Sequence, residues 1–205
     1  MFITALRFIL FDKPKSIGAL FGVVISIFLI GQQVGIFVFL TGAMSKLVDN
    51  VDTDIWVVDN KTTNVNALSP IDARFQRQLE GVPGVEHVYP LVIAASSARF
   101  ENGKSAGVTL VGSQAPSFVG GPWNIVNGKK EQLLFDGAVS TDVFDKNLLG
   151  GASAGTQFEI GGKRASVVFQ TKGVRGFGAS YVFTTIDRAR FFGMFPVTRV
   201  SALLI

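Results

Sequence analysis

A single histidine limits the chemistry that this chain could perform. His87 is the only histidine among 205 residues, and the chain has no cysteine. A Ser-His-Asp arrangement would therefore have to use His87 with a serine such as Ser96 or Ser97. Missing thiols exclude a cysteine nucleophile and a zinc–thiolate site, and one histidine excludes a multi-histidine metal site. We keep an anchored hydrolase as a third hypothesis, and a surface or packed histidine as the simpler interpretation.

Two glycine-containing segments lack the spacing of phosphate-binding motifs. Gly103-Lys104-Ser105 matches the end of a P-loop, but Ala98 stands where that motif needs its first glycine. The glycines at 173, 176 and 178 are in the wrong order for a dinucleotide fingerprint and precede a predicted strand. The formal net charge of +4 is too small for a nucleic-acid-binding footprint. We therefore predict no cofactor, no metal and no nucleic-acid partner.

The element that must position everything else is a long uncharged segment. Between Lys15 and Lys46 no side chain is charged, and this stretch of about thirty residues exceeds the roughly twenty that cross a bilayer core. We predict a transmembrane helix over residues 16–45, because a single span satisfies its backbone groups only as a helix. A cleaved signal peptide is the alternative, but its apolar region is only about 7 to 15 residues long.

Charge on either side of this segment predicts its orientation. Basic residues precede it, whereas acidic residues follow Lys46, and Lys and Arg stay cytoplasmic. We expect residues 1–15 at the cytoplasmic face, with Met1–Phe11 as an interfacial helix, and residues 46–205 outside. The stalk after the span would carry helix motion into the outer domain. Its candidate residues are Lys46, Asp49, Asp52 and Asp54.

Small and amide side chains lie near the middle of the span. Gly31, Gln32 and Gly35 are candidates for a helix-packing stripe, because such residues in lipid usually face another helix. Tolerated polar residues in an overlong helix are the alternative.

The outer part alternates strand and helix signals, which predicts an α+β fold with one mixed domain. The turn signals Asn102-Gly103 and Gly161-Gly162 predict two hairpins. Ser69 and Pro70 resemble a helix start. The predicted strands cover 54–59, 85–100, 105–112, 137–140, 156–160, 163–171, 181–184 and 197–205. The predicted helices cover about 70–80, 141–147 and 186–192, with a long loop at 113–128.

The order of these parts resembles the permease subunits of ABC transporters of the FtsX-like, MacB type, and most of all the DevC-type permeases of cyanobacterial exporters. The segments that carry the resemblance are Lys13-Pro14-Lys15-Ser16, Asp54-Ile55-Trp56-Val57-Val58, Val82-Pro83-Gly84-Val85, Asp136-Gly137-Ala138-Val139, Gly161-Gly162-Lys163-Arg164-Ala165 with Val167-Val168, and Tyr181-Val182-Phe183-Thr184-Thr185 with Ala189. They cover the whole chain as short apolar and glycine marks.

The resemblance implies a non-enzymatic, mechanical part of an exporter. It implies a MacB-like periplasmic core domain in the bacterial inner membrane, in a homodimeric permease that is driven by an ABC ATPase subunit. It also implies contact with a periplasmic adaptor (membrane-fusion) protein. The family continues after this domain into three further spans, whereas this chain stops at Ile205. We therefore expect the N-terminal portion of a truncated, split or excised permease.

An exported binding or sensing module is the second hypothesis. Phe118, Trp123 and the glycine loop around Phe177 could then line a pocket. In the permease hypothesis, Arg175 and Phe177 of this loop are candidates for a partner contact, and an ordinary connecting turn is the alternative.

Overall fold

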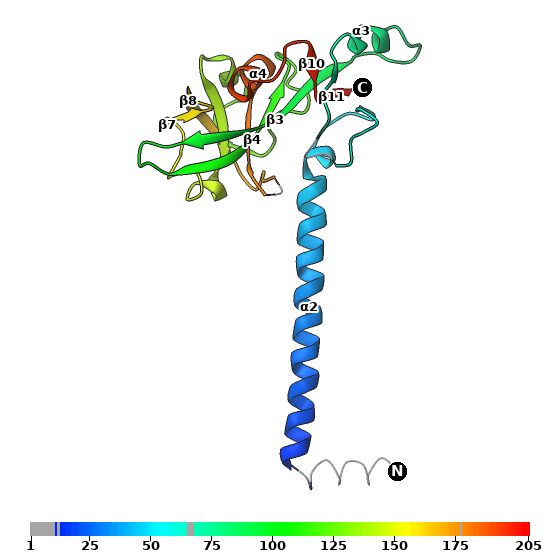
Figure 1. Cartoon of the computed structure of the whole chain (residues 1–205), viewed down its shortest axis with the longest axis vertical. Helices are drawn as coiled ribbons and strands as arrows, with labels where there is room; N and C mark the ends of the chain where they lie inside the picture. Colours follow the sequence, from blue (N-terminus) through cyan, green and yellow to red (C-terminus); the bar gives the residue numbers. More distant parts are fainter. Residues whose placement is uncertain (1–10, 12, 65–67, 177) are drawn as a thin grey trace. The chain divides into compact units, whose positions relative to one another are not determined.

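The computed structural model describes residue 11 and residues 13–64, 68–176 and 178–205 (Figure 1). The chain divides into two compact units, residues 1–42 and residues 43–205. The interfacial helix that we expect over Met1–Phe11 lies, apart from Phe11, outside the described residues.

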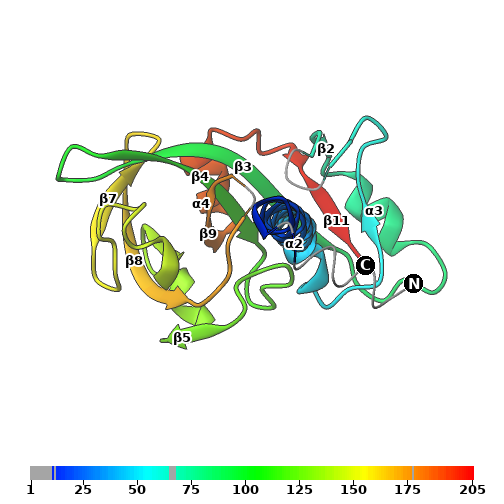
Figure 2. The ribbon, with the colours of Figure 1, turned by 90° about the horizontal axis from the view of Figure 1, so that it is seen from below.

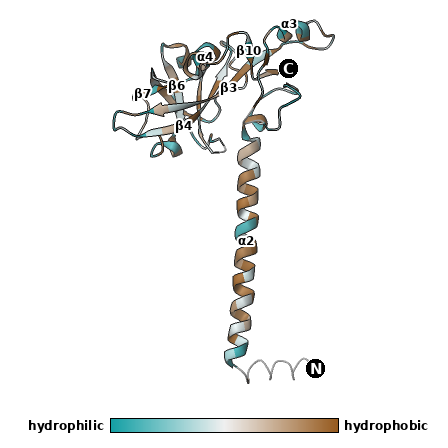
Figure 3. Cartoon of the chain, in the orientation of Figure 1, coloured by the Kyte–Doolittle hydropathy of each residue, from teal (hydrophilic) through white to brown (hydrophobic). Residues whose placement is uncertain are grey.

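The first unit consists of the helix α2, Lys13–Asp49, whose last residues belong to the second unit. Among the described residues it is the one helix long and apolar enough to cross a membrane, and its most apolar window of 18 residues has a mean hydropathy of 2.3. Apolar residues cover α2 except for a hydrophilic band (Figure 3). The hydroxyls of Ser26 and Thr41 donate to backbone carbonyls four residues earlier, so these polar groups are satisfied within the helix.

The second unit is built on a mixed sheet. In the described residues, nine strands form this sheet, and β2 (Ile71–Asp72) and β10 (Arg199–Val200) form a separate pair. The nine are β1 (Trp56–Val57), β3 (Tyr89–Arg99), β4 (Ser105–Ser113), β5 (Ile125–Asn127), β6 (Ala138–Asp142), β7 (Gln157–Ile160), β8 (Lys163–Thr171), β9 (Ser180–Thr185) and β11 (Ala202–Leu204). The helical elements are α3 (Phe75–Glu80), α4 (Ile186–Gly193), and the 3-10 turns η1 (Lys130–Leu134) and η2 (Val143–Asp145).

The long strand β3 organises the sheet. One of its edges pairs with β4 from Leu91 opposite Ser113 to Arg99 opposite Ser105. Its other edge is shared by β11 at one end and β7 at the other (Figure 2). Both predicted hairpins are confirmed. Gly161 and Gly162 have φ of 57° and 74°, and this backbone is what a two-residue turn between twisted strands requires.

The helix predicted over about 70–80 is wrong in its first half. Ile71 is buried and pairs with Val200, so the chain is extended where Pro70 had indicated a first helical turn. The carboxylate of Asp72 then accepts the backbone N–H of Arg74 at 2.9 Å, and the helix α3 begins only at Phe75. Pairing with a distant strand outweighs the local helix signal here.

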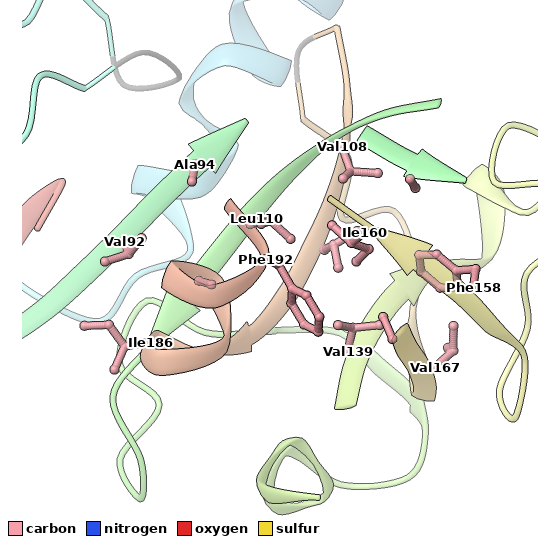
Figure 4. Close-up of a cluster of buried hydrophobic side chains, with 14 of the residues drawn as sticks. Val92, Ala94, Val108, Leu110, Val139, Phe158, Ile160, Val167, Ile186 and Phe192 are labelled. Atoms are coloured by element: carbon pink, nitrogen blue, oxygen red, sulfur yellow. The ribbon is translucent and has the colours of Figure 1, made fainter. Parts of the chain in front are cut away.

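Two apolar clusters lie on the two faces of β3, β4 and β9. We call the first the barrel cluster, because strands and α4 enclose it (Figure 4). Its buried members are Ile71, Val88, Val92, Ala94, Ala98, Phe100, Val108, Leu110, Val139, Leu149, Ala152, Phe158, Ile160, Ala165, Val167, Val182, Ile186, Ala189, Phe192, Val200 and Leu203. Any Cβ at Gly112 would collide with Ala189, so a glycine is needed where α4 packs directly on β4.

We call the second the helix-end cluster, because it contains Leu47 of α2. Its buried members are Leu47, Val51, Leu91, Ile93, Val111, Phe118, Leu133, Phe169, Val174, Tyr181, Phe183, Ala202 and Leu204. Successive residues of β3 alternate between the two clusters, as the two-residue period of a strand requires.

Candidate functional site

The last turn of α2 is built into the domain. Leu47 is fully buried in the helix-end cluster, and Val51 follows it there. The ammonium group of Lys46 donates a hydrogen bond of 2.7 Å to the carbonyl of Gly173. Burial of a leucine and a charge-assisted hydrogen bond therefore fix the same helical turn to the domain.

The loop that receives Lys46 is held from its other side by Asp142. This carboxylate at the end of β6 is fully buried. It accepts the hydroxyl of Thr171 at 3.1 Å and the backbone N–H groups of Val174 at 2.7 Å and Phe144 at 2.9 Å. Three donors satisfy the buried charge, and they fix the start of the loop between β8 and β9.

An ion pair extends this attachment. The guanidinium Nε of Arg175 lies 2.6 Å from the carboxylate of Asp145, without the angles of a hydrogen bond. Asp145 is 1% exposed, whereas the Arg175 side chain is 51% exposed. A buried carboxylate without a counter-charge destabilises the folded state, so Arg175 stabilises the domain by pairing with Asp145.

The loop continues over an aromatic surface. A Cβ at Gly176 would lie 2.6 Å from Cε1 of Tyr181, so only glycine lets the backbone pass so close to this ring. Burial raises the pKa of the Tyr181 phenol, so the hydroxyl stays neutral in the folded domain. Phe177, the second residue predicted to contact a partner, lies outside the described residues.

Two predicted site residues meet at this junction. Lys46 donates a hydrogen bond to the loop at residues 171–176, and Arg175 is part of that loop. The acidic stalk residues do not join them. Asp49 and Asp52 are exposed, and Asp54 contributes only its backbone N–H, which donates to Ile205 at 2.9 Å.

The predicted helix-packing stripe lies on an exposed part of α2. In the single chain no atom lies within 4 Å of a Cβ built at Gly31 or Gly35, and Gln32 is exposed. A role for Gly31, Gln32 and Gly35 in helix packing remains a prediction.

Sequence reasoning missed Asp142 and Asp145. We had interpreted the segment from Thr141 as a helical turn, and η2 at Val143–Asp145 is indeed such a turn. Two acids beside the apolar strand at 138–140 were a signal of a buried polar site. Their partners, however, are about thirty residues further along the chain, where no local pattern indicates them.

The hypothetical hydrolase arrangement is not assembled. His87 is exposed, and its ring lies tilted beside that of Tyr89, with ring centroids 5.9 Å apart. The hydroxyl of Ser96 donates to the carbonyl of Phe192, and Ser96 lies seven strand residues beyond Tyr89, or roughly 23 Å. In the part of the chain that the structure describes, no three His, Cys, Asp or Glu side chains gather as a metal site.

The aromatic residues of the long loop serve packing. Phe118 is 5% exposed within the helix-end cluster. The indole ring of Trp123 packs edge-on against Phe183, with centroids 5.5 Å apart. Phe118 is therefore core, and the half-buried Trp123 packs against the same cluster.

Comparison with known proteins gives a likeness in structure. No protein-family model matches the chain, and no curated protein matches it either. The chain is similar to the periplasmic region of MacB from Actinobacillus actinomycetemcomitans, with a TM-score of 0.53, 12% identity, and 77% of this chain and 78% of the other covered.

Two further solved structures are similar to a lesser degree. The extracellular domain of the noncanonic ABC-type transporter YknZ from Gram-positive bacteria matches with a TM-score of 0.46 and 17% identity, covering 73% of this chain and 79% of the other. A domain of a putative permease from Porphyromonas gingivalis matches with a TM-score of 0.43 and 13% identity, covering 61% and 57%. The domain described here therefore has the mixed α/β fold of the periplasmic region of MacB, which confirms at the level of fold the resemblance seen in the sequence.

Proposed function

We propose that this chain supplies a membrane helix and the periplasmic domain of the permease in an ABC-type exporter. The domain receives motion from the membrane helix and passes it to a periplasmic adaptor protein, while an ABC ATPase subunit supplies the energy. The full permease is a homodimer in the bacterial inner membrane, with its N-terminus in the cytoplasm and residues 46–205 in the periplasm.

The observation that carries this proposal is the junction. A helix of 37 residues, long and apolar enough to span a membrane, ends in a turn whose Leu47 is fully buried in a MacB-like domain. A flexible tether would serve an anchored binding module equally well. A helix end that is packed and hydrogen-bonded into the domain transmits displacement and rotation, which is what a mechanical subunit needs.

The segment that follows α2 supports the same proposal. The backbone N–H groups of Asp54 and Ile55 both donate to the carbonyl of Ile205, at 2.9 and 3.1 Å. Strand β1 continues this contact by pairing with β11. The segment that follows the membrane helix is thus built into the sheet of the domain, which supports a helix that is mechanically joined to it.

Association with an ATPase tests the function. The full chain, expressed together with the genes beside its own, should co-purify with an ABC ATPase and bind a periplasmic adaptor. If neither an ATPase nor further membrane spans are encoded nearby, and none co-purifies, the proposal is wrong.

Orientation can be tested separately because the chain has no cysteine of its own. Lys104→Cys places one thiol in the exposed turn between β3 and β4, and Lys13→Cys places one at the start of α2. A membrane-impermeant maleimide should label Lys104→Cys in intact spheroplasts and Lys13→Cys only after lysis. The reverse pattern would overturn the periplasmic location.

The helix-packing prediction has a matched control in the same helix. Gly35→Leu should reduce co-purification with other permease segments, because leucine prevents close helix approach. Gly22→Leu adds the same side chain about 220° around the helix, so it should have a smaller effect. Equal recovery of partners with both variants would refute a stripe at Gly31, Gln32 and Gly35.

One cavity favours the alternative of a binding module. A cavity of about 830 Å³ beside α4 is lined by residues that include Pro90, Gln114, Thr185, Arg188 and Phe191. Its size suits a small molecule. A compound that raises the melting temperature of the full chain, in the absence of any ATPase partner, would support this second candidate.

A further inference from the structure

The nine-stranded sheet curves into a barrel that one pair of strands does not close. From β3, hydrogen-bonded pairing runs through β4 to β9 in one direction and through β7 and β8 to β6 in the other. The two ends of this series, β6 and β9, lie beside each other. Strand β4 is antiparallel to β3 and β9 is parallel to β4, whereas β7 is antiparallel to β3, β8 is antiparallel to β7 and β6 is parallel to β8. The strands β6 and β9 therefore run antiparallel to each other. No strand pairing joins them within the described residues, and we call the line between β6 and β9 the seam.

One side-chain hydrogen bond crosses this seam among the described residues. The hydroxyl of Thr184 in β9 donates to the carbonyl of Ala138 in β6 at 2.8 Å. The hydroxyls of Ser140, Thr141 and Ser180, on the same two strands, are buried and have no protein hydrogen-bond partner. A single side-chain hydrogen bond holds two strands less rigidly than a continuous backbone ladder does. The seam is therefore held less firmly than the nine-residue ladder between β3 and β4.

A set of hydrogen bonds from Arg188, which we call the first clamp, crosses one end of the seam, where β9 passes into α4. The guanidinium of Arg188 donates to the carbonyls of Leu133 and Leu134 at 2.9 and 3.2 Å, and to the hydroxyl of Thr185 at 3.3 Å. Leu133 and Leu134 belong to η1, just before β6. Arg188 thus fastens the end of β9 to the segment that leads into β6.

A second clamp crosses the opposite end and is joined to α2. There Asp142, the last residue of β6, holds Thr171 and Val174, and the loop that they begin leads into β9. The carbonyl of Gly173 in this loop receives the hydrogen bond from Lys46. The end of the membrane helix is therefore bonded to the segment that enters β9, while the same segment is bonded to β6.

We propose that the β6–β9 seam is a shear line through which the domain responds to its membrane helix. Displacement of the last turn of α2 acts through Lys46 on the loop at 171–176 and slides β9 along β6. The continuous β3–β4 ladder stays intact. Thr185, Arg188 and Leu134 line the cavity beside α4, so sliding at the seam changes the shape of that cavity.

This inference rests on the proposed function only for the origin of the displacement. The seam itself is a property of the chain and is measured without ATPase, adaptor or transport. A chain without transport partners can therefore have the seam, and a permease without a shearing seam can still transport.

Hydrogen exchange of the full chain in detergent micelles tests the seam. Backbone amides of β6 and β9 should exchange about tenfold faster than those of β3 and β4, because they open locally at the seam. Equal protection of the two pairs of strands would overturn the proposal.

Three variants test the connection to α2. Lys46→Met keeps the length of the side chain but removes its donor, and should speed exchange in residues 138–142 and 180–185 about fivefold, the effect of one lost hydrogen bond. Lys172→Met changes an exposed lysine of the same loop and is the matched control, for which we expect no change. Thr184→Val removes the seam bond itself and should act as Lys46→Met does.

The strands in which hydrogen exchange becomes faster show whether the proposal holds. Faster exchange confined to β6 and β9 in Lys46→Met and Thr184→Val supports the shear line. Unchanged exchange in both variants contradicts it. An equal increase in β3 and β4 reports general loss of stability and contradicts it as well.

Discussion

The barrel cluster and the helix-end cluster share the strands β3, β4 and β9 but differ in what covers them. The barrel cluster is covered by α4, which packs directly on Gly112 of β4. The helix-end cluster instead includes Leu47 of α2 and is flanked by the polar contacts of Lys46, Asp142 and Arg175. A closed apolar core gives stability alone, whereas a core completed by a membrane helix makes the domain's packing depend on where that helix lies.

The largest effect should come from the barrel cluster. Phe192 is 1% exposed, and Phe192→Ala should lower the free energy of unfolding by about 3 to 5 kcal/mol through lost burial and an unfilled cavity. Urea denaturation of the full chain in detergent micelles measures it. The neighbouring Phe191 is 58% exposed, so Phe191→Ala is the matched control. Equal losses for the two variants would show that α4 does not close the barrel as described.

A loss of similar kind but slightly smaller size should follow at the helix-end cluster. Leu47→Ala should cost about 2 to 5 kcal/mol, whereas Leu47→Met, which conserves volume, should cost less than about 1.5 kcal/mol. Trp56 and Trp123 both pack against this cluster, so their fluorescence should shift in Leu47→Ala. The same fluorescence should change little in folded Phe192→Ala. If both variants shift it equally, the two clusters are not separate.

The ion pair at the junction should have a smaller effect. Arg175→Gln leaves the buried Asp145 without its counter-charge and should cost about 1 to 3 kcal/mol. The half-exposed position of Arg175 keeps the loss below that of a fully buried pair. Adding Asp145→Asn should restore part of the stability, since no buried charge is then left alone. Strictly additive losses in this double-mutant cycle would mean that the two side chains do not interact.

The smallest effect should lie outside both clusters. The guanidinium and backbone N–H of Arg74 donate to Asp72 and lower the pKa of its carboxyl from 3.8 to about 2. Because the folded pKa is the lower one, this pair stabilises the domain above about pH 4 and stops doing so as the pH falls through about 2. Carboxyl NMR titration measures it, with Arg74→Gln as control. If the pKa of Asp72 is the same in both proteins, the Arg74 side chain does not lower it.

Local patterns in the sequence predicted the elements whose signals are local. The turn at Gly161-Gly162 fixes a hairpin because its backbone needs left-handed glycines. The uncharged segment predicts the helix, which continues past the predicted end at residue 45 to Asp49 because no breaker stands there. The segment at Ile71 was misjudged, since its partner Val200 is far away in sequence.

The candidate site was predictable only in part for the same reason. Position at the end of the span identified Lys46, and an arginine in a glycine loop identified Arg175. Lys46 and Gly173 are 127 positions apart, and Asp142 and Val174 are 32 apart, so no periodicity or spacing connects them. Only the folded chain shows that Lys46 and Arg175 meet at one loop, and their predicted roles as a stalk residue and a partner contact stay predictions.

The attachment of the helix end to the domain can be tested most directly by limited trypsin digestion of the full chain in micelles. Lys61 lies in an exposed loop, whereas Lys46 precedes the buried Leu47. We expect rapid cleavage after Lys61 and an intact bond after Lys46, since cleavage there requires the junction to open. In Leu47→Ala, in the same micelles, the bond after Lys46 should become sensitive. Cleavage after Lys46 at the same rate in both proteins would contradict a helix end that is packed into the domain.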